Sequence, residues 1–164
     1  MDFTAKISAA QTVRALIARG WHIAFAESCT AGLCAARLVD VPDASRVLQV
    51  SFVTYAESAK TEYLAVPPEL IAQYGVVSEE VAAAMARGCA ARAGAEVAVG
   101  VTGFAGPSGG TPDAPVGTVC FGFSVGGAVT TVTRHFGAIG RAEVRAAATD
   151  FVFEELTRIF TSNG

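Results

Sequence analysis

The chain has 164 residues, of which 52% are apolar and 16% are charged, and its formal net charge is −3. This length fits one domain spanning 1–164 with a sizeable buried core, and the composition excludes an intrinsically disordered chain. The basic residues are scattered, without the clusters that bind a nucleic-acid backbone, so we expect no nucleic-acid partner and at most a phosphate on a small ligand.

Hydrophobic periodicity and turn residues divide the chain into alternating helices and strands. The first helix ends before Gly20, Pro67-Pro68 starts another, and Ser78 is a good N-cap for the next. In chain order the sequence predicts helix 7–19, strand 21–26, helix 29–39, strand 47–55, helices 57–65, 68–74 and 79–93, strand 96–102, a glycine-rich loop over 103–115, strands 117–125 and 128–136, and helix 141–160.

This order favours an α/β domain with a mixed, mainly parallel sheet, to which a hairpin adds one antiparallel strand. Residues 114–133 carry no charge and are long enough to cross a membrane. Their glycines, including the pair Gly126-Gly127, are more typical of two buried strands joined by a tight turn. We therefore expect no membrane association.

Cysteine and histidine usage points to neither a disulfide framework nor a metal site. Cys29, Cys34, Cys89 and Cys120 form no C-x-x-C pair, and two histidines do not make a metal centre. Residues 1–20 do not resemble a signal peptide, so we expect a cytoplasmic protein whose cysteines are mostly small core residues. No cofactor is expected.

Polar side chains gather where predicted strands end, which is where binding sites form in open α/β sheets. The first group is Glu27-Ser28-Cys29-Thr30, after the first strand. Ser28 could be a nucleophile or merely a helix cap, and a Cys29 thiolate is an alternative nucleophile. On composition alone the cap is the better explanation of Ser28.

Three further segments could contribute to the same edge of the sheet. Lys60 is one of only two lysines, and a lysine can act as a base if burial lowers its pKa, although a solvated lysine is the simpler interpretation. The run from Thr102 to Gly110 could hold an anion on its backbone amides, or be a plain loop. Arg141 and Arg145, one turn apart, could bind a phosphate or carboxylate, or be ordinary surface charges.

Taken together, these segments resemble the CinA C-terminal domain family, whose stand-alone members are nicotinamide-nucleotide amidases. The resemblance spans nearly the whole chain. It is carried by Ala26-Glu27-Ser28-Cys29-Thr30-Ala31-Gly32, Phe52-Val53-Thr54-Tyr55 with Lys60, Gly75-Val76-Val77-Ser78-Glu79, Thr102-Gly103-Phe104-Ala105-Gly106-Pro107, Gly109-Gly110 and Pro115-Val116-Gly117-Thr118-Val119.

The resemblance implies a three-layer α/β/α fold and hydrolysis of nicotinamide mononucleotide to nicotinate mononucleotide and ammonia. It assigns the nucleophile to Ser28, the base to Lys60, a supporting hydroxyl to Thr102 and a supporting arginine to Arg141, with Arg145 as the alternative. The remaining residues expected to contact the substrate are Glu27, Cys29, Thr30, Tyr55, Gly103, Gly106 and Arg145.

Other interpretations stay open at this point. The chain could be a non-catalytic nucleotide-binding or interaction module, as the association of CinA-type proteins with competence suggests. Its low charge and long apolar strands also favour a homo-oligomer, most simply a C2 dimer.

Overall fold

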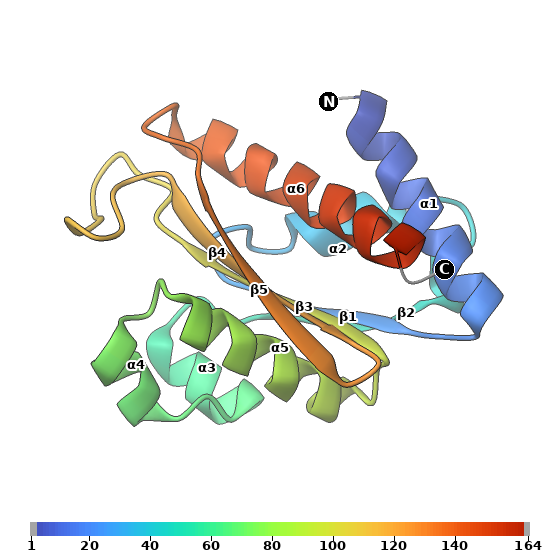
Figure 1. Ribbon diagram of the computed structural model, residues 1–164, viewed down its shortest axis with the longest axis horizontal. Coiled ribbons are helices and arrows are strands. Elements are labelled where there is room, and N and C mark those ends of the chain that lie inside the picture. Colours follow the sequence, from blue (N-terminus) through green and yellow to red (C-terminus); the bar gives the residue numbers. More distant parts are fainter. Residues whose placement is uncertain (1–2, 163–164) are drawn as a thin grey trace.

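The computed structural model describes residues 3–162, and its centre is a five-stranded sheet in the order β2-β1-β3-β4-β5 (Figure 1). β1 pairs in parallel with β2 and β3, whereas β4 pairs antiparallel with β3 and β5. Of these five strands only β4 runs in reverse, which confirms the predicted mixed, mainly parallel sheet. The strands are β1 (Ile23–Glu27), β2 (Leu48–Val53), β3 (Val97–Gly103), β4 (Thr118–Val125) and β5 (Ala128–His135).

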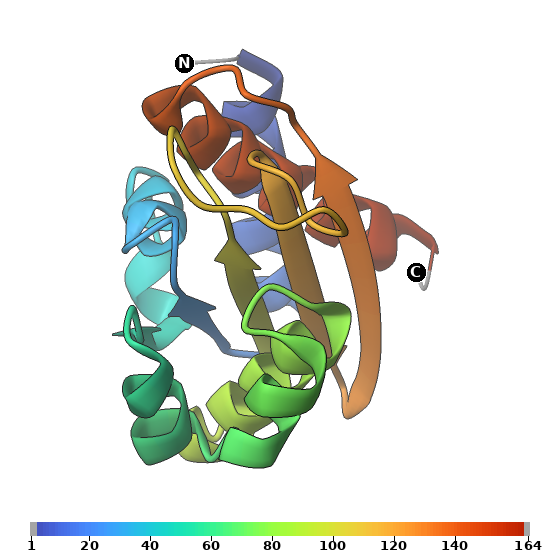
Figure 2. The same ribbon diagram turned by 90° about the vertical axis from the view of Figure 1, so that its left-hand side faces the viewer.

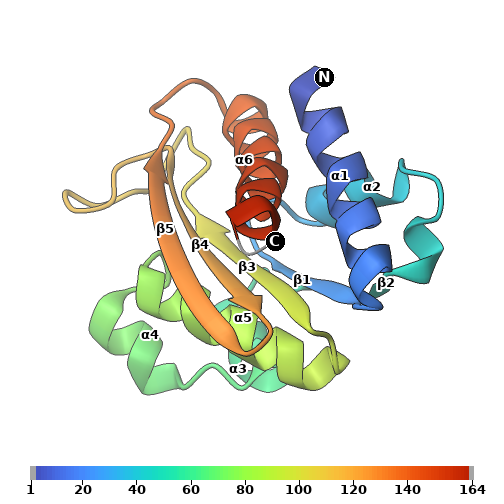
Figure 3. The same cartoon turned by 45° about the vertical axis from the view of Figure 1, so that its right-hand side comes forward.

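Helices cover both faces of the sheet (Figure 1, Figure 3). One face carries α1 (Phe3–Arg19), α2 (Leu33–Val39) and α6 (Arg141–Ser162), and the other carries α3 (Glu57–Leu64), α4 (Pro68–Tyr74) and α5 (Glu79–Ala93). A short 3-10 helix, η1 (Ala44–Arg46), precedes β2. The three-layer α/β/α arrangement is therefore confirmed.

Two apolar clusters hold the layers together. Phe25 and Phe121 of the sheet pack with Phe153 of α6 on one face, and Met85 of α5 packs with Leu64 of α3 on the other. Every residue of β1 is buried, because the strand is covered on both faces. This double burial explains why the central strands read as continuous apolar runs.

Glycines let α5 lie unusually close to its neighbours. A Cβ on Gly122 of β4 would lie 2.3 Å from the carbonyl oxygen of Ala82, and one on Gly88 of α5 would lie 1.8 Å from that of Leu64. No side chain fits such a contact without moving backbone. The sheet, α5 and α3 are thus locked together, and α3 is the helix that carries Lys60.

Most predicted elements lie within two residues of their observed bounds. Helices 68–74 and 79–93 are α4 and α5, and Ser78 caps α5 by accepting a hydrogen bond from the Val81 amide. Residues 118–135 form the β4–β5 hairpin that was expected within the uncharged segment. Within residues 3–162, no helix combines the length and the apolar character that a membrane span needs.

The predicted helix 29–39 is wrong at its start, because α2 begins only at Leu33. Residues 28–32 form a turn in which the Ala31 amide donates to the Ser28 carbonyl oxygen at 3.0 Å. Ala31 and Gly32 adopt φ values of 46° and 97°, which an α-helix cannot contain. The α1 helix also starts earlier than the predicted residue 7, and η1 was not predicted.

Candidate active site

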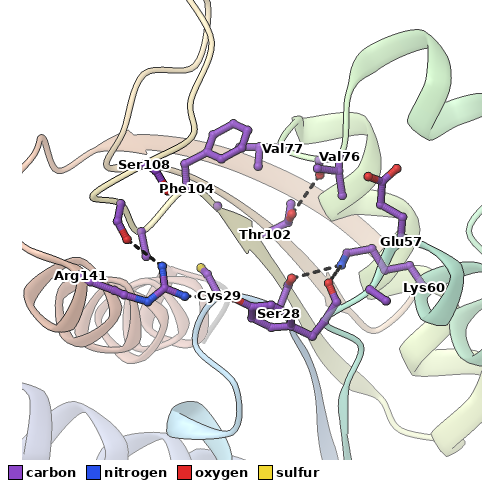
Figure 4. Close-up of a pocket in the computed structure, with 15 residues that line it drawn as sticks. Ser28, Cys29, Glu57, Lys60, Val76, Val77, Thr102, Phe104, Ser108 and Arg141 are labelled. Carbon is purple, nitrogen blue, oxygen red and sulfur yellow. Dashed lines mark hydrogen bonds between the residues drawn. The ribbon is translucent and has the colours of Figure 1, made fainter.

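The carboxyl ends of β1, β2 and β3 meet at one edge of the sheet, and the loop after β3 crosses in front of it (Figure 2). A hollow of about 340 Å³ opens there. Segments from β1, α3, the α4–α5 connection, β3 and α6 all reach it (Figure 4). It is lined by Ser28, Cys29, Tyr55, Ala56, Glu57, Lys60, Val76, Val77, Thr102, Gly103, Phe104, Ala105, Gly106, Ser108 and Arg141.

Ser28 stands directly after β1 and faces this pocket (Figure 4). Its amide donates to the Val101 carbonyl oxygen at 3.0 Å, which extends the pairing of β1 with β3 by one residue. The explanation of Ser28 as a helix cap is wrong, because Gly32 occupies the N-cap position of α2, without a side-chain bond. The Ser28 hydroxyl instead lies 3.1 Å from the Lys60 ammonium nitrogen.

Lys60 projects from α3 and is completely buried, which a solvated surface lysine would not be. Its Nζ also donates to the carbonyl oxygens of Thr54, at 2.6 Å, and Tyr55, at 3.3 Å. Burial lowers the pKa of Lys60 below its ordinary value of 10.5, and the nearby Glu57 carboxylate opposes that shift. A lysine in this environment is a better base at neutral pH than one in water.

Thr102 and Arg141 complete the polar lining. The Thr102 hydroxyl donates to the Val76 carbonyl oxygen at 2.9 Å, which ties the α4–α5 connection to β3. The Arg141 guanidinium donates to the Gly106 carbonyl oxygen at 2.7 Å and to the Tyr55 hydroxyl at 2.9 Å. Arg141 therefore joins three segments that surround the pocket.

Three predicted substrate contacts do not reach the pocket, and their positions correct that part of the prediction. Glu27 is completely buried and its two carboxylate oxygens accept hydrogen bonds from the Cys34 and Ala35 amides, at 2.9 and 3.2 Å. Thr30 is also completely buried. Arg145 donates to the carbonyl oxygens of Cys29 and Thr30. None of the three lines the hollow, and the side chains of Glu27 and Arg145 instead hold the turn that carries Ser28.

The thiol of Cys29 lines the pocket, but its environment disfavours the reactive form. Burial raises the pKa of Cys29 to about 11. At neutral pH the side chain is therefore a thiol and not the nucleophilic thiolate. Cys34, Cys89 and Cys120 are likewise buried and free, as expected for core cysteines.

Glu57, Val76, Val77 and Phe104 line the pocket but were absent from the predicted site residues. Each is next to, or within, a segment that the sequence already marked as unusual. Within the described range 3–162, no group of three or more His, Cys, Asp or Glu side chains is arranged to bind a metal ion.

Comparison with known proteins places these features in one family. The family model of the CinA C-terminal domain matches residues 5–160. A nicotinamide-nucleotide amidohydrolase, PncC, of Enterobacter agglomerans is 45% identical over 150 residues, which are 91% of each chain. A CinA-like protein of Mycolicibacterium gilvum is 48% identical over 153 residues, which cover 93% of this chain.

The chain spans only about a quarter to a third of the length of several such CinA-like relatives. Among solved structures, a CinA superfamily protein of Klebsiella pneumoniae superposes with a TM-score of 0.91 at 34% identity, covering 96% of this chain and 98% of that one. By sequence and by fold, the chain belongs to the CinA C-terminal domain family.

Proposed function

We propose that this protein is an amidohydrolase that converts nicotinamide mononucleotide to nicotinate mononucleotide and ammonia, with Ser28 as nucleophile and Lys60 as its base. The observation that carries the proposal is the 3.1 Å contact between a pocket-facing serine and a completely buried lysine. The 45% identity to an amidohydrolase over 91% of both chains supports the same reaction class.

The partners of Lys60 favour proton transfer from Ser28. The two carbonyl oxygens that contact Nζ can only accept hydrogen bonds, so they take two of its N–H groups. In the neutral amine these are all the protons that Nζ carries, and its lone pair is left for the third partner, the Ser28 hydroxyl. The neutral lysine is thus oriented to accept the serine proton.

The reaction then follows the logic of a Ser–Lys pair. Ser28 Oγ bonds to the carboxamide carbon while its proton moves to Lys60, and the carbonyl π electrons move onto the oxygen. When the intermediate collapses, the C–N bond breaks and Lys60 returns the proton to the leaving nitrogen, which departs as ammonia. Water then attacks the acyl ester and loses a proton to Lys60, and the ester C–O bond breaks as Lys60 returns that proton to Ser28 Oγ. The acid product loses its remaining proton to solvent and leaves as the carboxylate.

Two other side chains have roles that their hydrogen bonds restrict. Because the Thr102 hydroxyl donates to Val76, its oxygen faces the substrate as an acceptor, suited to a carboxamide N–H. Arg141 uses only part of its five N–H donors on Gly106 and Tyr55, and the rest suit the phosphate of the substrate.

The test is ammonia release from nicotinamide mononucleotide by the purified wild type and two variants. We expect Ser28→Ala and Lys60→Met each to lower kcat/KM by about a thousandfold or more, because each removes one half of the proposed pair. The chain offers matched controls in Ser58, which is exposed on α3, and Lys6, which is exposed on α1. Ser58→Ala and Lys6→Met should leave the rate unchanged.

Circular dichroism and thermal melting of each variant separate lost chemistry from lost folding. A wild type that binds pyridine nucleotides without releasing ammonia would contradict the proposal and favour a binding module. Full activity in a folded Ser28→Ala variant, with loss in Cys29→Ala, would move the nucleophile to Cys29.

A further inference from the structure

The two exposed charged side chains of the pocket, Glu57 and Arg141, have opposite signs. Arg141 reaches it from α6 on one side and Glu57 reaches it from α3 on the other, beside Lys60, with Ser28 lying between them (Figure 4). Glu57 is exposed, whereas Lys60 is buried. The end of the pocket next to the proposed base therefore carries a carboxylate.

Helix stability accounts for an acid at this position only in part. Glu57 is the first residue of α3, where a negative charge stabilises the helix by about 0.3–1 kcal/mol. Glu69 does the same in the first turn of α4, yet it does not line the pocket. The placement of Glu57 beside Lys60 and Ser28 is thus a separate feature that the helix does not require.

We propose that Glu57 is a specificity-determining residue that selects substrates whose carboxamide is attached to a cationic aromatic ring. This inference rests on the proposed function, because a pyridinium nucleotide has a fixed positive charge on the ring and a negative charge on the phosphate. The separation of charge in the substrate matches that in the pocket, with the ring at the Glu57 end and the phosphate at the Arg141 end.

Positive charge builds up in the pocket as the proposed reaction proceeds, so the stabilising effect of a nearby carboxylate increases. When Lys60 accepts the Ser28 proton it becomes a cation, and it then lies close to a ring that is also positive. Two like charges in a partly enclosed site repel each other strongly. Glu57 lines the same pocket beside Lys60, so its negative charge offsets this repulsion at the stage where it is greatest.

Glu57 also acts on Lys60 directly, since its carboxylate raises the pKa of that lysine. Through Lys60, Glu57→Gln would lower the pKa of the lysine further and leave it less often charged, which would favour binding of a cationic ring over a neutral one. A loss of affinity confined to the cationic ring therefore reports the direct attraction of Glu57 and not its influence on the base.

The experiment measures ligand affinity in the Ser28→Ala background, with and without Glu57→Gln. The two ligands are nicotinamide mononucleotide and its analogue with a benzene ring in place of the pyridinium, which keeps the shape and the carboxamide. We expect Glu57→Gln to raise Kd for the pyridinium ligand about tenfold and to change Kd for the neutral analogue less than about twofold. Glu69→Gln, the matched control, should change neither.

Equal changes for both ligands would overturn the inference, because Glu57 would then act only through the fold. No change for either ligand would overturn it as well. These failures are distinct from failure of the proposed function, which shows as a wild type that releases no ammonia. A shifted affinity ratio with an inactive wild type would keep the selectivity and reject the reaction.

Discussion

Glu27 and Lys60 are both completely buried at the same edge of the sheet, and both come from segments that adjoin Ser28. The partners of Glu27 are two backbone amides at the start of α2, which are too weakly acidic to give up a proton to a side chain at neutral pH. The partners of Lys60 are two backbone carbonyls and one hydroxyl that faces a pocket. A buried charged side chain has a structural role when all its partners are fixed backbone groups. It can take part in proton transfer when one of its partners is a hydroxyl that faces a pocket.

The largest effect that tests this comparison is on stability. The Glu27 carboxylate accepts hydrogen bonds from two backbone amides, and in Glu27→Gln an NH₂ group would face one of those amides and could not accept its hydrogen bond. We therefore expect the free energy of unfolding to fall by about 2 kcal/mol. The folded variant should keep the wild-type kcat/KM within about threefold, since Glu27 does not line the pocket. Urea denaturation and ammonia release measure the two quantities.

Glu62→Gln, on the exposed side of α3, is the control and should change stability by less than about 0.5 kcal/mol. A stable Glu27→Gln variant with a large loss of activity would break the distinction between the two buried charges.

The pH dependence tests the Lys60 half of the comparison. Because the base must be neutral, kcat/KM should rise with pH and level off above the lowered pKa of Lys60, which lies below 10.5. Between that pKa and 10.5 the unfolded chain binds the lysine proton more than the folded chain does, so stability relative to Lys60→Met should also rise with pH. Rates measured from neutral pH up to 10.5 check the first expectation, and urea midpoints over the same span check the second. A rate that falls as Lys60 loses its proton would contradict the assignment.

The smallest expected effect is that of Cys29→Ala. With its pKa raised to about 11 by burial, the thiol has no nucleophilic role at neutral pH, so kcat/KM should change by less than about twofold. Alkylation by a thiol reagent should likewise be slow at pH 7. A rapid, inactivating alkylation at Cys29 would show that its thiolate is populated.

Local signals predicted much of the fold. Pro67-Pro68, Ser78 and Gly94 mark the ends of α4 and α5 because each has a specific backbone conformation or a missing donor. Gly126-Gly127 marks the β4–β5 turn in the same way. The predicted start of α2 was too early because the predicted helix includes Gly32, although glycine is a poor helix former. The left-handed conformation of Ala31 and Gly32 excludes residues 29–32 from α2.

The site residues at the ends of strands could be predicted from the sequence, whereas those on other segments were harder to predict. Ser28 and Thr102 adjoin parallel strands, whose carboxyl ends must meet. The burial of Lys60 depends on how α3 packs, and the approach of Val76 and Val77 depends on the path of the α4–α5 connection. Hydrophobic periodicity predicts neither the packing of α3 nor the path of the α4–α5 connection. For the same reason, sequence spacing could not separate the pocket-facing Arg141 from Arg145.

The way in which Ser28 is anchored determines where the protein can be changed. Its amide is paired with Val101, the preceding Glu27 ties β1 to α2, and Arg145 holds the two carbonyls that follow. These bonds fix the backbone of the turn that carries Ser28. Adjustments to ligands of other sizes must therefore come from the opposite wall, formed by Val76, Val77 and Phe104. Libraries that vary that wall alone should yield altered substrate ranges on an intact reactive centre.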